Sequence, residues 1–155
     1  MDPDAFIREF CAAVEAEDST RFAALFAEDG VYHDVFYGEF AGRERIAAMI
    51  RDWFCRDATD FRWDMRDPVF DGTTLYARYV FSFRSKLPEA AGKRAMFEGV
   101  SIMTFRHNLI AAYREVANTM PGLVDLGFAP ERIARIAAKE GAALRRSGEA
   151  ARHLA

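Results

Sequence analysis

The sequence has little of several features that particular classes of protein require. Of its 155 residues only three are histidine and two are cysteine, and His33, His107 and His153 lie far apart. They show no ligand spacing and have no cysteine nearby, as a metal site would require. Neither a nucleophile motif nor a glycine-rich phosphate loop is present. We therefore expect no metal site and no cofactor.

Positive charge is not in excess either. The 21 basic and 24 acidic residues give a net charge of −3, and no basic cluster with interleaved aromatic residues occurs. Nucleic acid is therefore not an expected partner. No apolar run approaches the length of a membrane span, and the N-terminus, MDPDAF, is acidic, unlike a secretory or mitochondrial signal. We expect a cytoplasmic protein with no membrane partner, in which Cys11 and Cys55 are reduced thiols in helices.

Aromatic residues, in contrast, are abundant. Hydrophobic residues make up 51% of the chain, and fourteen residues are phenylalanine. This surplus indicates a lined cavity, a subunit interface or both. A chain of this length without internal repeats or a linker forms one domain with a sizeable core. We place that domain at residues 1–146 and expect the small, polar end, 147–155, to fray.

The spacing of the apolar residues predicts the order of the elements. A period of 3.6 residues predicts helices in the first third of the chain, and a period of two predicts strands from Phe61 onward. The helices are expected at 4–17, at about 20–26, at 43–55 and from Pro130 onward. The strands are expected from 61, at 75–84, at 95–105 and at 109–118, with turns at Asp71-Gly72 and His107-Asn108. Short connections make these strands an antiparallel sheet.

One stretch, FAEDGVYHDVFYGEFAG at residues 26–42, lies between the helices and carries a candidate acid–base group. It is expected to start as the end of a helix, to turn, and to become a short strand. Alternation along that strand puts Tyr32 and Asp34 on one face and His33 and Tyr37 on the other. A carboxylate beside a phenol among apolar neighbours suits acid–base chemistry. The alternative is an ordinary strand whose carboxylate accepts hydrogen bonds from main-chain amides.

The order helix, helix, strand, helix and then a four-stranded sheet resembles the nuclear transport factor 2-like superfamily. The segments FAEDG, G-R-E-x-I, AYREVAN and LGFAPERI are similar to the SnoaL-like branch of polyketide cyclases, over residues 5–137. The resemblance implies an α+β cone, in which helices pack on a curved, mainly antiparallel sheet and enclose an apolar pocket. It also implies a homodimer formed through the outer face of the sheet. We expect that interface to bury Tyr79, Phe81 and Phe83.

The resemblance to ketosteroid isomerases implies roles for two acidic residues. Their carboxylate base lies on the strand after the second helix, where this chain has Asp34, and burial beside an apolar cavity would raise its pKa. Glu98 falls where those enzymes keep a protonated acid that donates to an oxyanion. Phe10 takes the place of their tyrosine on the first helix. The alternative for Glu98 is an ion pair with an arginine, such as Arg78 or Arg114.

The resemblance to limonene epoxide hydrolases implies a different set. Tyr32 and Asp34 match the tyrosine and amide that hold the attacking water, and Glu115 matches the carboxylate of the last strand. Arg78 matches an arginine between two acids, and Val80 stands where the second acid would be.

In SnoaL-like cyclases the acid–base aspartate of the last strand aligns with Asn118 instead. If Glu115 faces the cavity, Tyr113 and Ala117 do so too, which leaves Arg114 and Asn118 on the outer face.

The sequence thus predicts a cofactor-independent acid–base enzyme acting on a small, largely apolar molecule. Isomerase, cyclase, dehydratase and epoxide hydrolase chemistry all remain open, and the alternative is a non-catalytic ligand-binding or interaction module. The expected catalytic residues are Asp34 as base, Tyr32 as its hydrogen-bonding partner, Glu98 or Glu115 as acid, and Arg78 to set their protonation. The expected substrate-binding residues are Phe10, Trp53, Val80, Val100, Tyr113 and Asn118.

Overall fold

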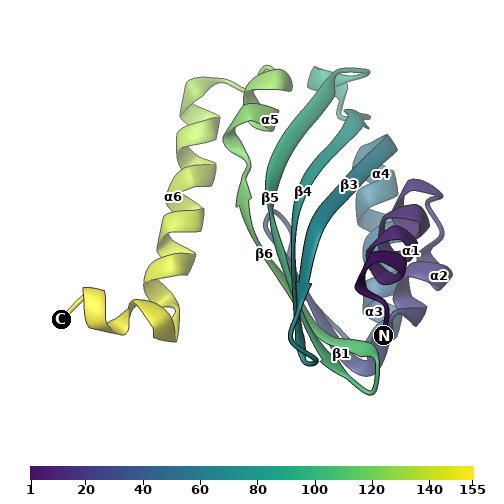
Figure 1. The fold of residues 1–155 in the computed structure, drawn as a ribbon. Helices are drawn as coiled ribbons and strands as arrows, with labels where there is room; N and C mark the ends of the chain where they lie inside the picture. Colours follow the sequence, from purple (N-terminus) through teal and green to yellow (C-terminus); the bar gives the residue numbers. More distant parts are fainter.

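The computed structural model describes all 155 residues and has a curved six-stranded sheet with helices on both of its faces (Figure 1). The strands are β1 (Phe26–Asp34), β2 (Gly38–Ala41), β3 (Ala58–Phe70), β4 (Thr74–Ser85), β5 (Arg94–Arg106) and β6 (Leu109–Asn118). The helices are α1 (Pro3–Glu15), α2 (Ser19–Ala24), α3 (Arg43–Ala48), α4 (Cys55–Asp57), α5 (Met120–Asp125) and α6 (Pro130–Arg146). Helices α1–α4 cover the concave face, whereas α6 lies on the other side of the sheet (Figure 1).

The N-terminal helices form where the apolar spacing predicts them. Asp2 caps α1 by accepting hydrogen bonds from the amides of Asp4 and Ala5, and the apolar side of this helix is buried. The third helix is longer than expected, because α4 extends it beyond Cys55, and a π-helical segment, Met49–Phe54, joins α3 to α4. The continuous helical run therefore ends at Asp57, which brings this residue to the sheet.

The sheet order is β2-β1-β6-β5-β4-β3, and the four long strands β3–β6 are antiparallel, as the short turns predict. β1 runs parallel to β6 and pairs with β2, a strand that we did not predict. β1 also begins at Phe26, where we expected the end of a helix. Phe26 lies opposite Ile110 in the sheet and both are completely buried, so cross-strand packing outweighs the local helical pattern.

The alternation along β4 decides which side chains face the helices. Leu75, Ala77 and Tyr79 are buried on the concave face, whereas Tyr76 and Val80 are exposed on the convex face. The prediction that Tyr79, Phe81 and Phe83 form an outer, dimer-forming row is therefore wrong. These rings pack against Trp63 and Phe61 of the neighbouring strand, inside the cone.

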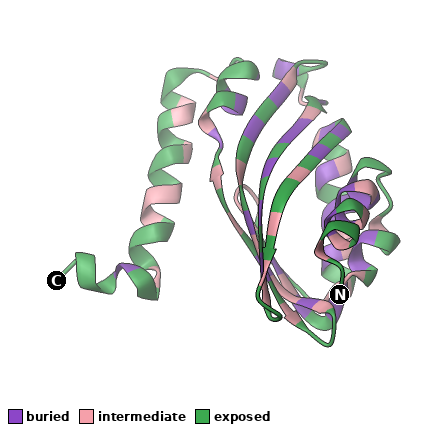
Figure 2. Cartoon of the chain, in the orientation of Figure 1, coloured by how far each residue is buried: buried purple, intermediate pink, exposed green.

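The core lies between the concave face of the sheet and α1–α4 (Figure 2). α6 has no buried residue, and it is followed by a 3-10 helix, Gly148–His153, in the segment that we expected to fray. Both cysteines are free, and Cys11 is buried in α1. None of the helices is both long enough and apolar enough to span a membrane.

Candidate active site

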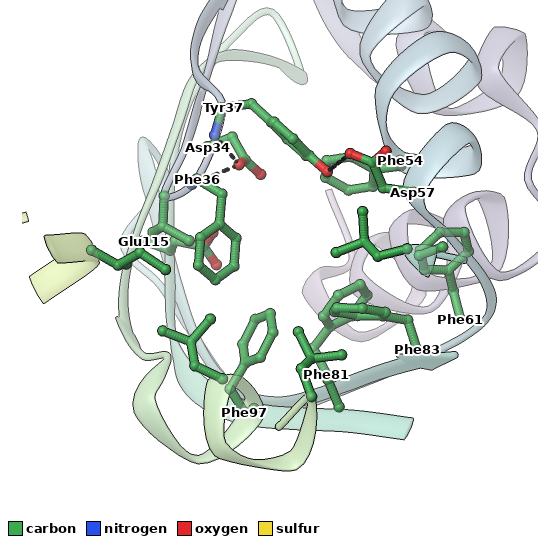
Figure 3. A pocket seen from close by; sticks show the side chains of 18 of the residues that line it. Asp34, Phe36, Tyr37, Phe54, Asp57, Phe61, Phe81, Phe83, Phe97 and Glu115 are labelled. Atoms are coloured by element: carbon green, nitrogen blue, oxygen red, sulfur yellow. Dashed lines mark hydrogen bonds between the residues drawn. The ribbon is translucent and has the colours of Figure 1, made fainter. Parts of the chain in front are cut away.

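A cavity of about 330 Å³ opens between the concave face of the sheet and the helices (Figure 3). Eighteen of its 23 lining residues are hydrophobic, so the few polar side chains define its chemistry. Four of the remaining five are charged: Asp34, Asp57, Glu115 and Arg132.

Asp34 stands at the end of β1 and points into this cavity (Figure 3). Its Oδ1 accepts hydrogen bonds from the backbone amides of Phe36 and Tyr37, each at 2.9 Å. This Asx-type turn ends the strand and brings both aromatic side chains into the cavity wall. Oδ2 makes no hydrogen bond within the protein. Burial raises the pKa of Asp34 to about 6, although the two amide donors act in the opposite direction.

Glu115 enters the same cavity from β6 (Figure 3). Its Oε2 accepts hydrogen bonds from the phenols of Tyr79, at 2.5 Å, and Tyr113, at 3.2 Å. The hydroxyl groups of Tyr113 and the completely buried Ser101 lie 2.9 Å apart, which extends this network. Burial raises the pKa of Glu115 to about 7, and the nearby charge of Asp34 acts in the same direction. The two acids thus share one property: each has one carboxyl oxygen engaged by protein donors and one that is not.

Tyr32 lines the cavity beside Asp34, which confirms that the two side chains share a face. The expected hydrogen bond between them is absent, however. The Tyr32 ring stacks on that of Tyr113 at a centroid distance of 4.3 Å, and burial raises the pKa of Tyr32 well above its ordinary value. Tyr32 is therefore a neutral support for Tyr113, the residue that donates to Glu115.

A second polar contact, which the sequence did not reveal, lies on the opposite wall. The phenol of Tyr37 donates a hydrogen bond of 2.7 Å to Oδ2 of Asp57. Arg56 pairs with the same carboxylate at 2.7 Å, and its hydrogen bond lowers the pKa of Asp57 below the usual value. Tyr37 was predicted to point away from Asp34. The strand ends at Asp34, so alternation no longer applies three residues later.

Several expected site residues lie on the convex face of the sheet and cannot reach the cavity: Glu98, Arg78, Val80, Val100 and Asn118. Their neighbours on the concave face, Tyr79 and Phe97, are buried instead. Arg78 forms an ion pair with Asp67. Arg78 therefore does not contact Glu115; the next residue of β4, Tyr79, donates a hydrogen bond to it.

Phe10 and Trp53 do not line the cavity either. Phe10 is completely buried and stacks on Tyr113 at 5.5 Å, so it packs against a residue that donates to Glu115. Trp53 is 38% exposed and packs against the outer side of Tyr37 and against Phe40. Of the expected substrate-binding residues, only Tyr113 is part of the site, through its bond to Glu115.

Tyr79 is the important residue that the sequence analysis missed, and one signal pointed to it. Gly99 lies opposite Tyr79 in the sheet, and a side chain there would meet the Tyr79 hydroxyl at 2.7 Å and the Val116 carbonyl oxygen at 2.5 Å. A glycine inside a strand often marks such a close approach. The phenol can therefore cross the glycine and reach Glu115.

The comparisons with known proteins agree with this architecture. A model of the SnoaL-like domain matches residues 7–113, about two-thirds of the chain. The chain belongs to the SnoaL-like family. It is thus a member of the nuclear transport factor 2-like superfamily, with the α+β cone expected of that fold. Among curated proteins, none matches the chain.

Solved structures resemble this SnoaL-like protein in fold. A protein from Catenulispora acidiphila with a ketosteroid isomerase-like fold, solved in complex with trimethylamine, is 18% identical with a TM-score of 0.71. The match covers 79% of this chain and 92% of that one. An LEH-like epoxide hydrolase from M. tuberculosis is 18% identical with a TM-score of 0.63, over 77% of this chain and 85% of that one. Likeness at this level of identity shows the fold alone, so the chemistry of this chain has to be argued from its cavity.

Proposed function

We propose that this SnoaL-like protein is a cofactor-independent acid–base enzyme in which Asp34 is the general base and Glu115 the general acid. The observation that carries the proposal is the pairing of two buried carboxyl groups in one apolar cavity, each with one oxygen not engaged by the protein. The pKa of Asp34 is about 6 and that of Glu115 is about 7, so a mildly acidic to neutral pH lies between the two values. Between those values Asp34 is mainly ionised and Glu115 mainly protonated, as base and acid catalysis require.

The roles follow from the hydrogen bonds. Asp34 has Oδ2 available to take a proton from a substrate carbon or from a water molecule. Glu115 has Oε2 occupied by two phenols, so its proton belongs on Oε1, from which it can pass to a developing negative charge. Asp34 takes one proton and Glu115 gives one. A further proton transfer, from Asp34 to Glu115 through product or water, restores the starting state.

The cavity lining supports a largely apolar substrate. Eighteen of the 23 lining residues are hydrophobic, and Asp57 is already paired with Arg56. Proton abstraction beside a carbonyl and water attack on an epoxide both need a base and an acid of this kind. The ligand of the Catenulispora protein, trimethylamine, is a small amine, so we include apolar amines among the candidate substrates.

A panel of simple substrates tests the proposal. The panel contains a β,γ-unsaturated cyclic ketone, whose double bond can migrate, and an enolisable diketone, whose proton loss is followed by deuterium exchange. It also contains a cyclic epoxide, which water can open. Turnover of any of them should fall at least about 100-fold in both Asp34→Asn and Glu115→Gln. Glu98→Gln, which removes an exposed carboxylate on the convex face, should leave it unchanged. Turnover that persists in Asp34→Asn would refute the assignment of the base.

The alternative is a binding module, in which the cavity holds a ligand without chemistry. Native mass spectrometry of the purified protein would reveal a retained ligand, and a ligand that leaves unchanged while the panel stays inert favours this alternative.

We also propose a homodimer and a cytoplasmic location, the latter in keeping with two free cysteines. The convex face carries exposed apolar side chains at Tyr76, Met96 and Val116, together with exposed charged residues of both signs. A second copy would cover them.

A further inference from the structure

The cavity has a marked imbalance of charge. Of its four charged lining residues, three are acidic and one is basic. The basic one, Arg132, pairs with Glu89 at 2.7 Å and stacks over the ring of Phe128 at 3.5 Å, so it is already engaged. Asp57 is balanced by Arg56. Neither Asp34 nor Glu115 has a cationic side chain within ion-pair distance.

The two uncompensated acids differ in what surrounds them. Glu115 is held by the phenols of Tyr79 and Tyr113, which suit either protonation state of the acid. Asp34 receives only two backbone amides, both on Oδ1, and its Oδ2 faces the hollow. An ionised Asp34 is thus a negative charge at an apolar cavity with no counter-charge from the protein.

The wall opposite these acids is aromatic. Eleven of the 23 lining residues carry an aromatic ring, and Figure 3 shows those of Phe54, Phe61, Phe81, Phe83 and Phe97 around the side of the hollow away from Asp34. The face of an aromatic ring attracts a cation, and rings arranged around a space recur where proteins bind ammonium groups. A neutral ligand would only bury Asp34 further, which disfavours the ionised carboxylate.

We propose that the cavity recognises an organic ammonium, held between the aromatic wall and the Asp34 carboxylate, with an apolar body filling the rest of the hollow. The cation supplies the charge that the protein itself does not provide. The volume of about 330 Å³ exceeds that of a bare ammonium head, which is why the ligand needs the apolar body. This inference rests on the site of the proposed function and names its substrate class, but binding of the cation requires no proton transfer.

Two molecules of the same shape, one cationic and one neutral, test this inference. 4-(Hydroxymethyl)-N,N,N-trimethylanilinium carries a positive charge, and 4-tert-butylbenzyl alcohol replaces the charged nitrogen by carbon; the alcohol group of neither molecule ionises between pH 5 and pH 8. Isothermal titration calorimetry at pH 8, where Asp34 is ionised, should show the cation binding at least about tenfold more tightly than its neutral counterpart. At pH 5 the preference should shrink towards unity because Asp34 is mainly protonated. The other titratable groups that face this space include Glu115, Asp57, Tyr37 and Tyr79. Asp57 stays ionised at pH 5, so it does not change the preference between the two pH values. Glu115 gains a proton at pH 5, and this also weakens the preference for the cation.

Variants separate the carboxylate from general electrostatics. Asp34→Asn should reduce the preference at pH 8, leaving only what the aromatic wall and Glu115 contribute, whereas Glu98→Gln, which changes the net charge equally, should retain it in full. The inference is overturned if the neutral molecule binds as tightly as the cation, if the cation does not bind, or if the preference is undiminished in Asp34→Asn. The proposed function has a separate test: ¹³C NMR titration of the carboxyl groups should place Asp34 near pH 6. A normal titration near pH 4 would remove the acid–base assignment, whereas a lost preference with Asp34 titrating near 6 would remove only the ammonium.

Discussion

Replacing Asp34 by Asn should make the protein more stable at neutral and alkaline pH. Asparagine has the same shape, and its Oδ1 can still accept the amide hydrogens of Phe36 and Tyr37. The substitution therefore keeps the turn that ends β1 and removes only the charge. A functional carboxylate would then be a local cost in stability, which its removal relieves.

The size of the effect follows from the pKa of Asp34, which rises from 3.8 to about 6 on folding. Between these values the folded chain holds more protons than the unfolded chain, so stability falls as pH rises through this window. Above pH 6 the full penalty is present: a shift of about 2.2 pKa units at 1.36 kcal/mol per unit gives about 3 kcal/mol. At pH 4 less than about 1 kcal/mol remains, because the folded carboxyl group is almost fully protonated and about 40% of the unfolded carboxyl groups are protonated too.

Thermal unfolding of both proteins between pH 4 and pH 8 checks this. At pH 8 the variant should unfold about 6–12 °C above the parent, and the two curves should converge towards pH 4. Asp57→Asn supplies a control of opposite sign, because Arg56 and Tyr37 stabilise the ionised Asp57, and it should lower the melting temperature at pH 8. An Asp34→Asn protein that is no more stable at pH 8, or that gains more at pH 4 than at pH 8, would refute the reasoning.

Three further changes probe the surroundings of the site. Tyr79→Phe removes the shorter hydrogen bond to Glu115, so the pKa of Glu115 should rise above about 7 in a ¹³C NMR titration, and an unchanged value would contradict the role of the phenol. Gly99→Ala places a methyl group against the Tyr79 hydroxyl and should lower the free energy of unfolding by about 1–3 kcal/mol, measured by urea denaturation, whereas an unaltered midpoint would show that Tyr79 can move. Val116→Lys on the convex face should convert a species of twice 17.5 kDa into a monomer by light scattering, and Val124→Lys, equally exposed on α5, should not; a dimer that survives Val116→Lys would place the interface elsewhere.

The fold could be predicted from the sequence because its long elements have clear periods. The turns at Asp71-Gly72 and His107-Asn108 set the register of β3–β6, and the apolar spacing of α1 identified its buried side. The start of β1 was missed because FAEDG has helical spacing, and only pairing with β6, some 80 residues later, makes it a strand. Local patterns do not contain such distant pairing.

The site was predictable only in part, for a similar reason. The sequence analysis named Asp34 and Glu115, and both line the cavity. Alternation alone could not decide which face of β4 turns inward, because aromatic residues occur on both faces of this strand. The inward row is the one whose rings, such as Tyr79, pack on Trp63. The resemblance placed Arg78 in a functional role, one residue away from Tyr79, and in a strand a displacement of one residue reverses the face.

Asp34 and Glu115 differ in pKa partly because each carboxyl group lies near the other. Burial raises both pKa values, and protein donors lower both, but the negative charge of Asp34 adds a further increase at Glu115. Once Asp34 has lost its proton, Glu115 therefore holds its own more firmly. Asp34→Asn should consequently lower the pKa of Glu115 from about 7, although Glu115 itself is not substituted. If the pKa of Glu115 stays the same in Asp34→Asn, the two groups titrate independently, and the order of proton transfer proposed for this cavity loses its physical basis.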